Sequence, residues 1–352
     1  MEILKKEEYG QFERFLRSQP DVSFMQSAAW RAVKDRWKHE VVVVRDEMGE
    51  IVGGMSVLIR TVFPGMTLLY APRGPVCDLS DEKTVRELLR GAQKLAEKYH
   101  AFALKIDPEV PESDRQTIRT LRACGFFHRS GAAEYETVQR RYNYVLLNLY
   151  EKSGEELLQS FKPKCRYNIR LAQRSGMVCK VQGTEGLDDF YALYESTGQR
   201  AGFSVRSKEY CRKLLEAFGR DARIFTAYRG ETPVASALMI TYAGRTSYLF
   251  GGSAHESHSK AGHAVMYEAI RWAAVQGCDT FDFMAVPVNL DEKSPMYGVY
   301  RFKSGFNGEV KAFAGEFDYV FRPYLWRCFC TMQKGKSTAE HLLHKITDQA
   351  DD

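Results

Sequence analysis

The feature that most constrains the fold is an order of elements that occurs twice along the chain. Each half contains three strand-like segments, a helical segment, a further strand and a second helix. Each half then ends in a glycine turn, "CGFF" at 124–127 and "KSGF" at 303–306. A repeat of this length indicates duplication of a domain, because the unit of a solenoid is shorter. We therefore predict an α+β fold of two tandem domains, with mixed sheets flanked by helices.

Runs of β-branched and aromatic residues between turn residues mark the expected strands. They lie within 39–60, 66–75, 101–107, 222–253 and 279–286. The expected helices of the two halves cover 80–98, 113–123, about 264–276 and a short stretch near 297. Between the halves, 155–181 is interpreted as a basic helical segment, and two amphipathic helices within 186–219 meet at Gly202.

These elements predict the domain boundaries. Residues 1–147 form the first domain, to which the tail 318–352 returns, and residues 148–317 form the second domain, which carries most of the site. The sequence contains no long heptad run, so we expect no coiled-coil arm.

Composition excludes several classes of protein. The chain has 352 residues and 50 basic against 45 acidic side chains, an excess that suits an anionic ligand but not a nucleic-acid coating protein. Its eight cysteines include no CxxC pair and are expected to be reduced thiols of a cytosolic protein. The charged, amphipathic N-terminus does not resemble a signal peptide, and no apolar run is long enough to span a membrane.

Each repeat resembles the Gcn5-related N-acetyltransferase fold. Acyl-CoA-dependent members of that fold carry Q/R-x-x-G-x-G/A where a helix N-terminus holds the pyrophosphate. Here "SKAGHA" at 259–264 retains a glycine and the final alanine, but Ser259 replaces the leading Gln or Arg. The equivalent "CDLSDEKTV" at 77–85 has no glycine. These departures disfavour acyl-CoA as the donor.

Nearly the whole chain resembles the Fem family of peptidoglycan bridge aminoacyltransferases, in its compact FemX-like form. The resemblance is carried, in this order, by "FMQSAAWRAVKDRW", "LKIDPEV", "KCRYNIRLAQRSGM", "RAGFSVRSKEYC", "YLFGGS" and "GVYRFKSGFNG". It implies transfer of an amino acid from aminoacyl-tRNA to a stem-peptide amine of a precursor, either UDP-MurNAc-pentapeptide or the lipid-linked muropeptide. It also implies a cytoplasmic enzyme without cofactor or metal, with possible peripheral contact at the inner membrane surface.

The resemblance implies that Lys34, Arg206 and Tyr210 bind the diphosphate of the precursor. Arg206 and Tyr210 are four residues apart and can face one ligand from one helical turn. Arginine matches phosphate oxygens through two parallel N–H bonds, and a tyrosine hydroxyl adds a donor. The alternatives are a solvated Lys34 between core tryptophans and a surface ion pair of Arg206 with Glu209.

Further candidates follow from the same resemblance. Tyr248 is expected to contact the muropeptide and to lie on the same side of a strand as Phe250. The alternative is that Phe250 occupies the family's tyrosine position, where it would lack the hydroxyl. Lys303 is expected either to stabilise the oxyanion of ester aminolysis or to hold a phosphate of the terminal adenosine, with Phe302 against its sugar or base. The alternative for Lys303 is a solvated lysine at a turn.

Asp107 is a candidate acceptor for the proton of the attacking amine. The interpretation that we favour makes it a strand-end carboxylate that caps the following helix. Five cations on the basic helix, Lys162, Lys164, Arg166, Arg170 and Arg174, are expected to meet tRNA phosphates, an anionic membrane or only solvent. The histidines of "HESHSKAGH" fit no zinc spacing, and His341 and His344 are expected to be solvated.

Two other functions remain open at this point. One is an acyl-CoA-dependent N-acyltransferase, and the other is a protein that binds muropeptides or tRNA without catalysis. Because an aminoacyl ester is already activated, an aminoacyltransferase needs no covalent nucleophile, and the chain contains no GxSxG element.

Overall fold

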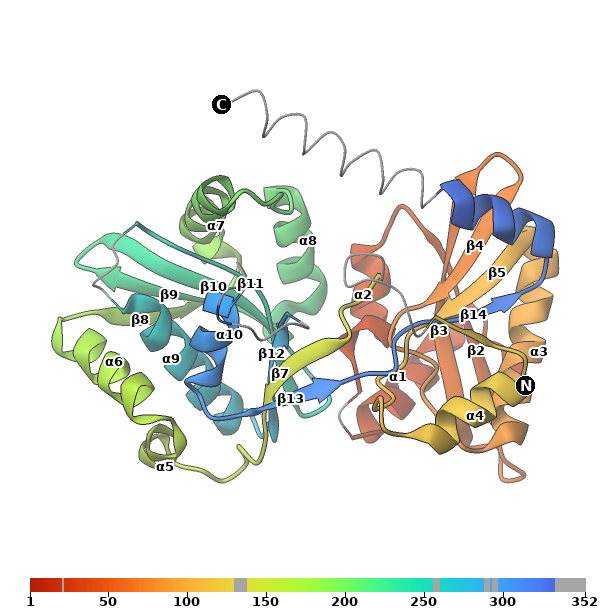
Figure 1. Cartoon of the computed structure of the whole chain (residues 1–352), viewed down its shortest axis with the longest axis horizontal. Coiled ribbons are helices and arrows are strands. Elements are labelled where there is room, and N and C mark those ends of the chain that lie inside the picture. The colour runs from red at the N-terminus through yellow and green to blue at the C-terminus, as the bar shows by residue number, and fades with distance from the viewer. Residues whose placement is uncertain (21, 130–137, 256–259, 288–291, 293–296, 333–352) are drawn as a thin grey trace. The chain divides into compact units, whose positions relative to one another are not determined.

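The computed structural model describes residues 1–332 except 21, 130–137, 256–259, 288–291 and 293–296. The chain divides into two compact units, coloured mainly red to yellow and green to blue in Figure 1. Unit 1 comprises 1–12, 36–139 and 313–352, and unit 2 comprises 13–35 and 140–312. Each unit is built around its own seven-stranded sheet.

The sheet of unit 1 has the order β1-β2-β3-β4-β5-β14-β6. Its strands are β1 (Glu2–Ile3), β2 (Lys38–Arg45), β3 (Ile51–Phe63), β4 (Met66–Ala71), β5 (Ala101–Ile106), β14 (Phe317–Val320) and β6 (Phe127–His128). Only β4 and β5 run parallel among these pairs. The helices α3 (Glu82–Tyr99) and α4 (Arg115–Ala123) cover the sheet's apolar face.

The packing of α3 follows from its sequence. Apolar residues recur at helical spacing and are buried against β2 to β5. Gly91 lies so close to β2 that an added Cβ would stand 2.3 Å from a methyl group of Val42. The helix begins where Asp81 accepts a hydrogen bond from Lys83 N and ends at His100, whose φ is +54°.

The sheet of unit 2 has the order β13-β7-β12-β11-β10-β9-β8, with β11 and β12 parallel. Its strands are β13 (Glu309–Ala312), β7 (Tyr142–Leu146), β12 (Thr280–Ala285), β11 (Arg245–Ser253), β10 (Thr232–Tyr242), β9 (Ala222–Arg229) and β8 (Val178–Gln182). The helices are α2 (Ala28–Val33), α5 (Gly154–Ser160), α6 (Pro163–Arg174), α7 (Leu187–Ala201), α8 (Lys208–Phe218), α9 (Ala261–Val275) and α10 (Tyr297–Ser304). α7 and α8 pack on one face, and α9 with α6 outside it packs on the other (Figure 1).

The predicted α+β class is confirmed: two mixed sheets flanked by helices. The longest helix in the described residues is α3, with 18 residues, and none of the described helices is long and apolar enough to cross a bilayer. One local prediction was wrong, because 178–182 form strand β8 rather than a continuation of the basic helix. Gly176, with a φ of +76°, ends that helix and redirects the chain to pair with β9.

The compact units differ from the expected boundaries at three places, since 13–35 and 140–147 group with unit 2 and 313–317 with unit 1. The tail nevertheless returns to the first sheet, where β14 pairs with β5 and the buried Lys105 forms ion pairs with Glu316 and Asp318. The division into a domain of 1–147 with 318–352 and a domain of 148–317 stays a prediction.

Candidate active site

Lys34, Arg206 and Tyr210, predicted from three distant positions, lie together in unit 2. The ammonium of Lys34 donates a 3.0 Å hydrogen bond to the Tyr210 hydroxyl and lies 4.5 Å from the centre of the Trp30 ring. The guanidinium of Arg206 lies 5.5 Å from the centre of the Tyr210 ring. Two cations, a hydroxyl and an indole thus share one small region.

Local sequence explains how this cluster forms. α2 ends at Val33, so Lys34 is its C-cap, with φ −92° and ψ 39°. Ser207 is the N-cap of α8 and accepts a hydrogen bond from Tyr210 N at 3.2 Å. That cap places Arg206 one residue before the N-cap and Tyr210 on the first turn of the helix, while α2 packs against α8.

The electrostatics of the cluster favour an anionic ligand. Burial lowers the pKa of the Lys34 ammonium to about 8, and the neighbouring Arg206 cation also lowers it. Burial raises the pKa of Tyr210 to about 12, so its hydroxyl is neutral at pH 7 and can donate. Glu209 pairs at 3.6 Å with Arg212 rather than in the predicted alternative pair with Arg206. An anion between the two cations would offset their repulsion.

Lys303 lies elsewhere in unit 2, near the end of α10, and is only 6% exposed. Its ammonium donates 2.6 Å hydrogen bonds to the carbonyls of Phe283 and Ala285 on β12. Burial lowers the pKa of Lys303 to about 8, and Asp282 acts in the opposite direction. The alternative of a solvated lysine at a turn is therefore wrong, because the side chain is a buried helical cation fixed by two carbonyls.

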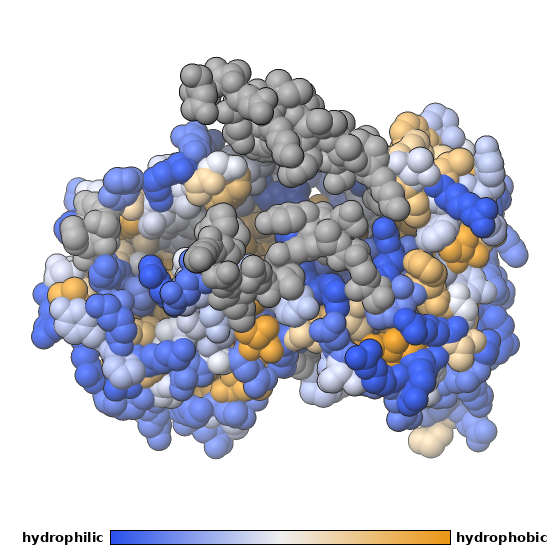
Figure 2. Space-filling view, viewed as in Figure 1, coloured by the Kyte–Doolittle hydropathy of each residue, from blue (hydrophilic) through white to orange (hydrophobic). Residues whose placement is uncertain are grey.

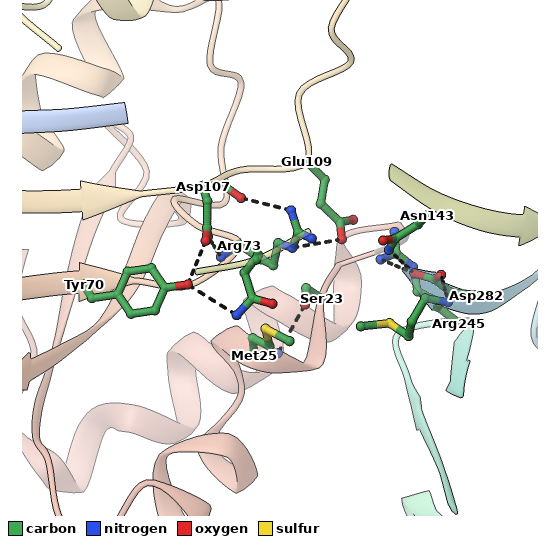
Figure 3. Close-up of polar contacts among 11 residues, drawn as sticks. Ser23, Met25, Tyr70, Arg73, Asp107, Glu109, Asn143, Arg245 and Asp282 are labelled. Atoms are coloured by element: carbon green, nitrogen blue, oxygen red, sulfur yellow. Dashed lines mark hydrogen bonds and ion pairs between the residues drawn. The ribbon is translucent and has the colours of Figure 1, made fainter. Parts of the chain in front are cut away.

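Asp282 belongs to a buried polar group that the sequence prediction missed. Its carboxylate accepts a 3.0 Å hydrogen bond from Asn143 Nδ2 and lies 3.9 Å from a guanidinium nitrogen of Arg245 (Figure 3). Met284 N donates to the same carboxylate at 2.7 Å. The only signal in the sequence was an aspartate inside the apolar strand "DTFDFMAV". This carboxylate supports the positive charge of Lys303.

Tyr248 and Phe250 lie on β11, but a bulge separates them. Tyr248 pairs with Met239 and Phe250 pairs with Leu238, and the register shifts between these two pairs. The bulge breaks the two-residue alternation that the prediction of a common direction assumed. Phe250 stacks on Tyr194 at 5.3 Å between ring centres, whereas Tyr248 packs against the core of unit 2, and burial raises its pKa to about 12.

Phe302 lines a cavity of about 710 Å³ between α6, α9 and α10. Four cationic side chains line the same cavity: Lys162, Lys164, Lys260 and Arg301. The ring of His263 packs edge-on against Phe302, with 4.9 Å between ring centres. Positive charge beside aromatic faces is the arrangement with which proteins hold single-stranded nucleic acid.

Asp107 lies in unit 1 and is 1% exposed. It accepts hydrogen bonds from the Tyr70 hydroxyl at 2.7 Å and from Arg73 N at 2.6 Å (Figure 3). Burial raises the pKa of Asp107 to about 6, and Arg73 opposes this shift. The expected helix cap was wrong, because Asp114 caps α4 instead, by accepting from Thr117 N.

For the basic helix and the histidines the sequence predicted no specific contact. On α6, Arg166 donates to the Phe161 carbonyl and Arg170 pairs with Glu155, so these two cations also serve the fold. The area of α6 is largely hydrophilic in Figure 2. Within the described residues no group of His, Cys, Asp or Glu is placed to bind a metal ion. His258, His341 and His344 lie outside those residues.

The chain is similar to known proteins in family, sequence and fold. A model of the FemAB family matches residues 4–229, and a model of an acetyltransferase (GNAT) domain matches 159–304. The chain is 28% identical to a UDP-N-acetylmuramoylpentapeptide-lysine N(6)-alanyltransferase of Weissella viridescens, covering 90% of this chain and 94% of the relative. It is 26% identical to a lipid II:glycine glycyltransferase of Staphylococcus haemolyticus, covering 90% and 92%.

Solved structures support the fold. The crystal structure of FemX superposes with a TM-score of 0.85 at 24% identity, over 93% of this chain and 99% of that chain. A tandem GNAT protein from the clavulanic acid biosynthesis pathway gives a TM-score of 0.51 at 15% identity, over 90% and 97%. The predicted tandem acyltransferase fold is thereby confirmed.

Proposed function

The chain belongs to the FemAB family, and from this premise we propose that it is an aminoacyltransferase of peptidoglycan precursor synthesis. It adds an amino acid to a stem-peptide amine of UDP-MurNAc-pentapeptide or of the lipid-linked muropeptide. The names of its relatives, an alanyltransferase and a glycyltransferase that act on such precursors, support this assignment. The observation that carries it is the cluster of Lys34, Arg206 and Tyr210.

This cluster binds the precursor's diphosphate. Arg206 donates through two N–H groups to phosphate oxygens, Lys34 adds a point charge, and the Tyr210 hydroxyl adds a neutral donor. The diphosphate is common to the soluble and the lipid-linked precursor, so the same cluster serves both. Tyr248 is proposed as a contact to the muropeptide.

The chemistry is aminolysis of an aminoacyl ester, and the proposed donor is aminoacyl-tRNA. The acceptor amine attacks the ester carbonyl carbon, the tetrahedral oxyanion collapses, and the C–O bond to the ribose of the tRNA breaks. The amine gives up one proton, for which Asp107 is the proposed acceptor, and a proton from solvent completes the hydroxyl on the departing ribose oxygen. Lys303 either stabilises the oxyanion or holds a phosphate of the donor's last nucleotide.

The cavity beside Phe302 supports the choice of tRNA as donor. Its four cations can neutralise phosphates of the unpaired 3′ end, and Phe302 offers a face on which a sugar or base can lie. We further propose a cytoplasmic enzyme that makes peripheral contact with the membrane when its acceptor is lipid-linked.

Label transfer tests the function. The protein is incubated with UDP-MurNAc-pentapeptide and tRNA charged with a radiolabelled amino acid, and the label on the peptide is counted. At precursor concentrations below the KM we expect transfer that Arg206→Ala and Lys303→Met both strongly reduce, whereas Arg271→Ala, whose side chain pairs with Glu268, retains it. Undiminished transfer in the first two variants would refute the site.

Two further measurements distinguish this function from the acyl-CoA-dependent enzyme and from the non-catalytic binding protein. Release of thiol from an acyl-CoA in the presence of the precursor would indicate the acyl-CoA-dependent enzyme instead. Tight binding of precursor or charged tRNA without label transfer, across a panel of charged tRNAs, would indicate a binding protein.

A further inference from the structure

One side chain that lines the basic cavity has a buried polar atom with no hydrogen-bond partner within the described part of the chain. It is Oδ1 of Asn168, on the inner side of α6, and the residue is only 6% exposed. Leaving a buried acceptor unsatisfied costs free energy, and such exceptions require an explanation. Because Asn168 lines the cavity, a ligand bound there can supply the missing donor.

The orientation of this amide is fixed by His263. Nδ2 of Asn168 lies 3.2 Å from Nε2 of His263, at the start of α9. Burial lowers the pKa of His263 to about 4, so the ring is neutral at pH 7 and its Nε2 can accept from the amide N–H. The ring of His263 in turn packs against the rings of Phe302 and Phe306. With Nδ2 engaged, Oδ1 is presented as an acceptor.

The surroundings define the chemistry of the ligand. Lys162, Lys164 and Arg301 can bind an anion, Phe302 can contact an aromatic or sugar face, and the unsatisfied oxygen of Asn168 can accept a hydrogen bond. A nucleotide whose base carries an exocyclic amine supplies all three. Both cytosine and adenine carry such an amine, whereas uracil has a carbonyl at the same place, so the unpaired CCA end of a tRNA offers an amine on every base.

We propose that Oδ1 of Asn168 accepts a hydrogen bond from an exocyclic base amine of the donor's 3′ end, which makes Asn168 a specificity-determining residue. This inference rests on the proposed function, because it takes the unpaired 3′ end of tRNA as the occupant of the cavity. The cations and Asn168 then have different roles. The cations bind phosphate whatever the base, and Asn168 recognises a base that carries an exocyclic amine.

The test uses RNAs that lack single amines. A 5′-phosphorylated ACCA tetranucleotide is compared with forms in which purine riboside replaces the terminal adenosine or pyrimidin-2-one riboside replaces either cytidine, and the Kd of each is measured by titration calorimetry. We expect at least one deletion to raise the Kd of the wild-type protein about 5- to 20-fold. The same deletion should have no effect on Asn168→Ala, and His263→Ala should lose most of the effect because the amide is no longer oriented.

Two control variants separate base recognition from charge. Lys164→Ala should weaken all the RNAs by a similar factor and keep the amine effect, and Arg271→Ala, whose side chain pairs with Glu268 on α9, should match the wild type. Equal Kd values for all the RNAs on the wild type would overturn this inference and leave the proposed function intact. An amine effect that persists in Asn168→Ala would overturn it in the same way. Failure of the parent RNA and of charged tRNA to bind would overturn both.

Discussion

At the scale of single residues, the most direct prediction concerns Arg206. Charge-assisted hydrogen bonds to phosphate contribute about 1.5–3 kcal/mol, so Arg206→Ala should raise the KM for UDP-MurNAc-pentapeptide roughly 10- to 100-fold. Arg206→Lys should recover part of this loss, because lysine keeps the charge but not the two parallel donors. Arg212→Ala is the matched control, since Arg212 lies six residues away and pairs with Glu209. Equal KM values for the two alanine variants would contradict the assignment.

Lys34 makes the affinity for the acceptor depend on pH. Its pKa is lowered to about 8, so the ammonium is mainly charged at pH 7 and loses its proton as the pH rises through 8. Arg206 stays charged throughout this range. We expect the Kd of UDP-MurNAc-pentapeptide to rise between pH 7 and 9.5 by up to about the factor that Lys34→Met causes at pH 7. In Lys34→Met the Kd should be nearly constant over the same range.

Direct binding measurements are required for this test, because Lys303 also has a pKa near 8 and would change the rate of transfer over the same range. A pH dependence of binding that survives Lys34→Met would assign the titration to another group.

At the scale of elements, the N-cap of α8 connects stability with binding. Replacing a serine N-cap by alanine costs about 0.5–2 kcal/mol. Ser207→Ala should lower the free energy of unfolding by about this amount and also weaken precursor binding, because the cap positions Arg206 and Tyr210. Ser153→Ala, which removes the cap of α5, should cost similar stability without changing the binding. Urea denaturation and precursor titration of the two variants check this prediction. Equal precursor affinity in both variants would show that the cap of α8 does not position the binding residues.

The elements also show how far the sequence could predict the structure. The two strand-helix repeats were predictable because apolar periodicity and turn residues are local signals. The strand β8 was not predictable, because its residues Val178, Lys180 and Val181 are exposed and form a strand only by pairing with β9. We predicted Lys34, Arg206 and Tyr210 from motifs that resemble those of the Fem family, and the structure places the three side chains together. The group of Asn143, Arg245 and Asp282 could not be found in this way, because three separate strands bring it together.

At the scale of the whole molecule, the net charge of +5 says little about where anions bind, because the cations are concentrated locally. The diphosphate cluster presents two positive side chains, whereas the cavity between α6, α9 and α10 presents four. Affinity for single-stranded nucleic acid falls with salt at a slope of about −0.7 for each neutralised phosphate. The two ligands of one enzyme should therefore differ in their response to salt.

For the ACCA tetranucleotide, four neutralised phosphates predict a slope of about −3, or roughly a 50-fold loss of affinity between 50 and 200 mM salt. Removing one cation with Lys164→Ala should reduce the slope to about −2. Binding of UDP-MurNAc-pentapeptide should depend less steeply on salt, because its diphosphate meets two cations and a neutral hydroxyl. Kd measurements for both ligands over a salt series decide this. An RNA affinity that does not change with salt would show that the four cations contact no phosphate, and the donor's 3′ end would have to bind elsewhere.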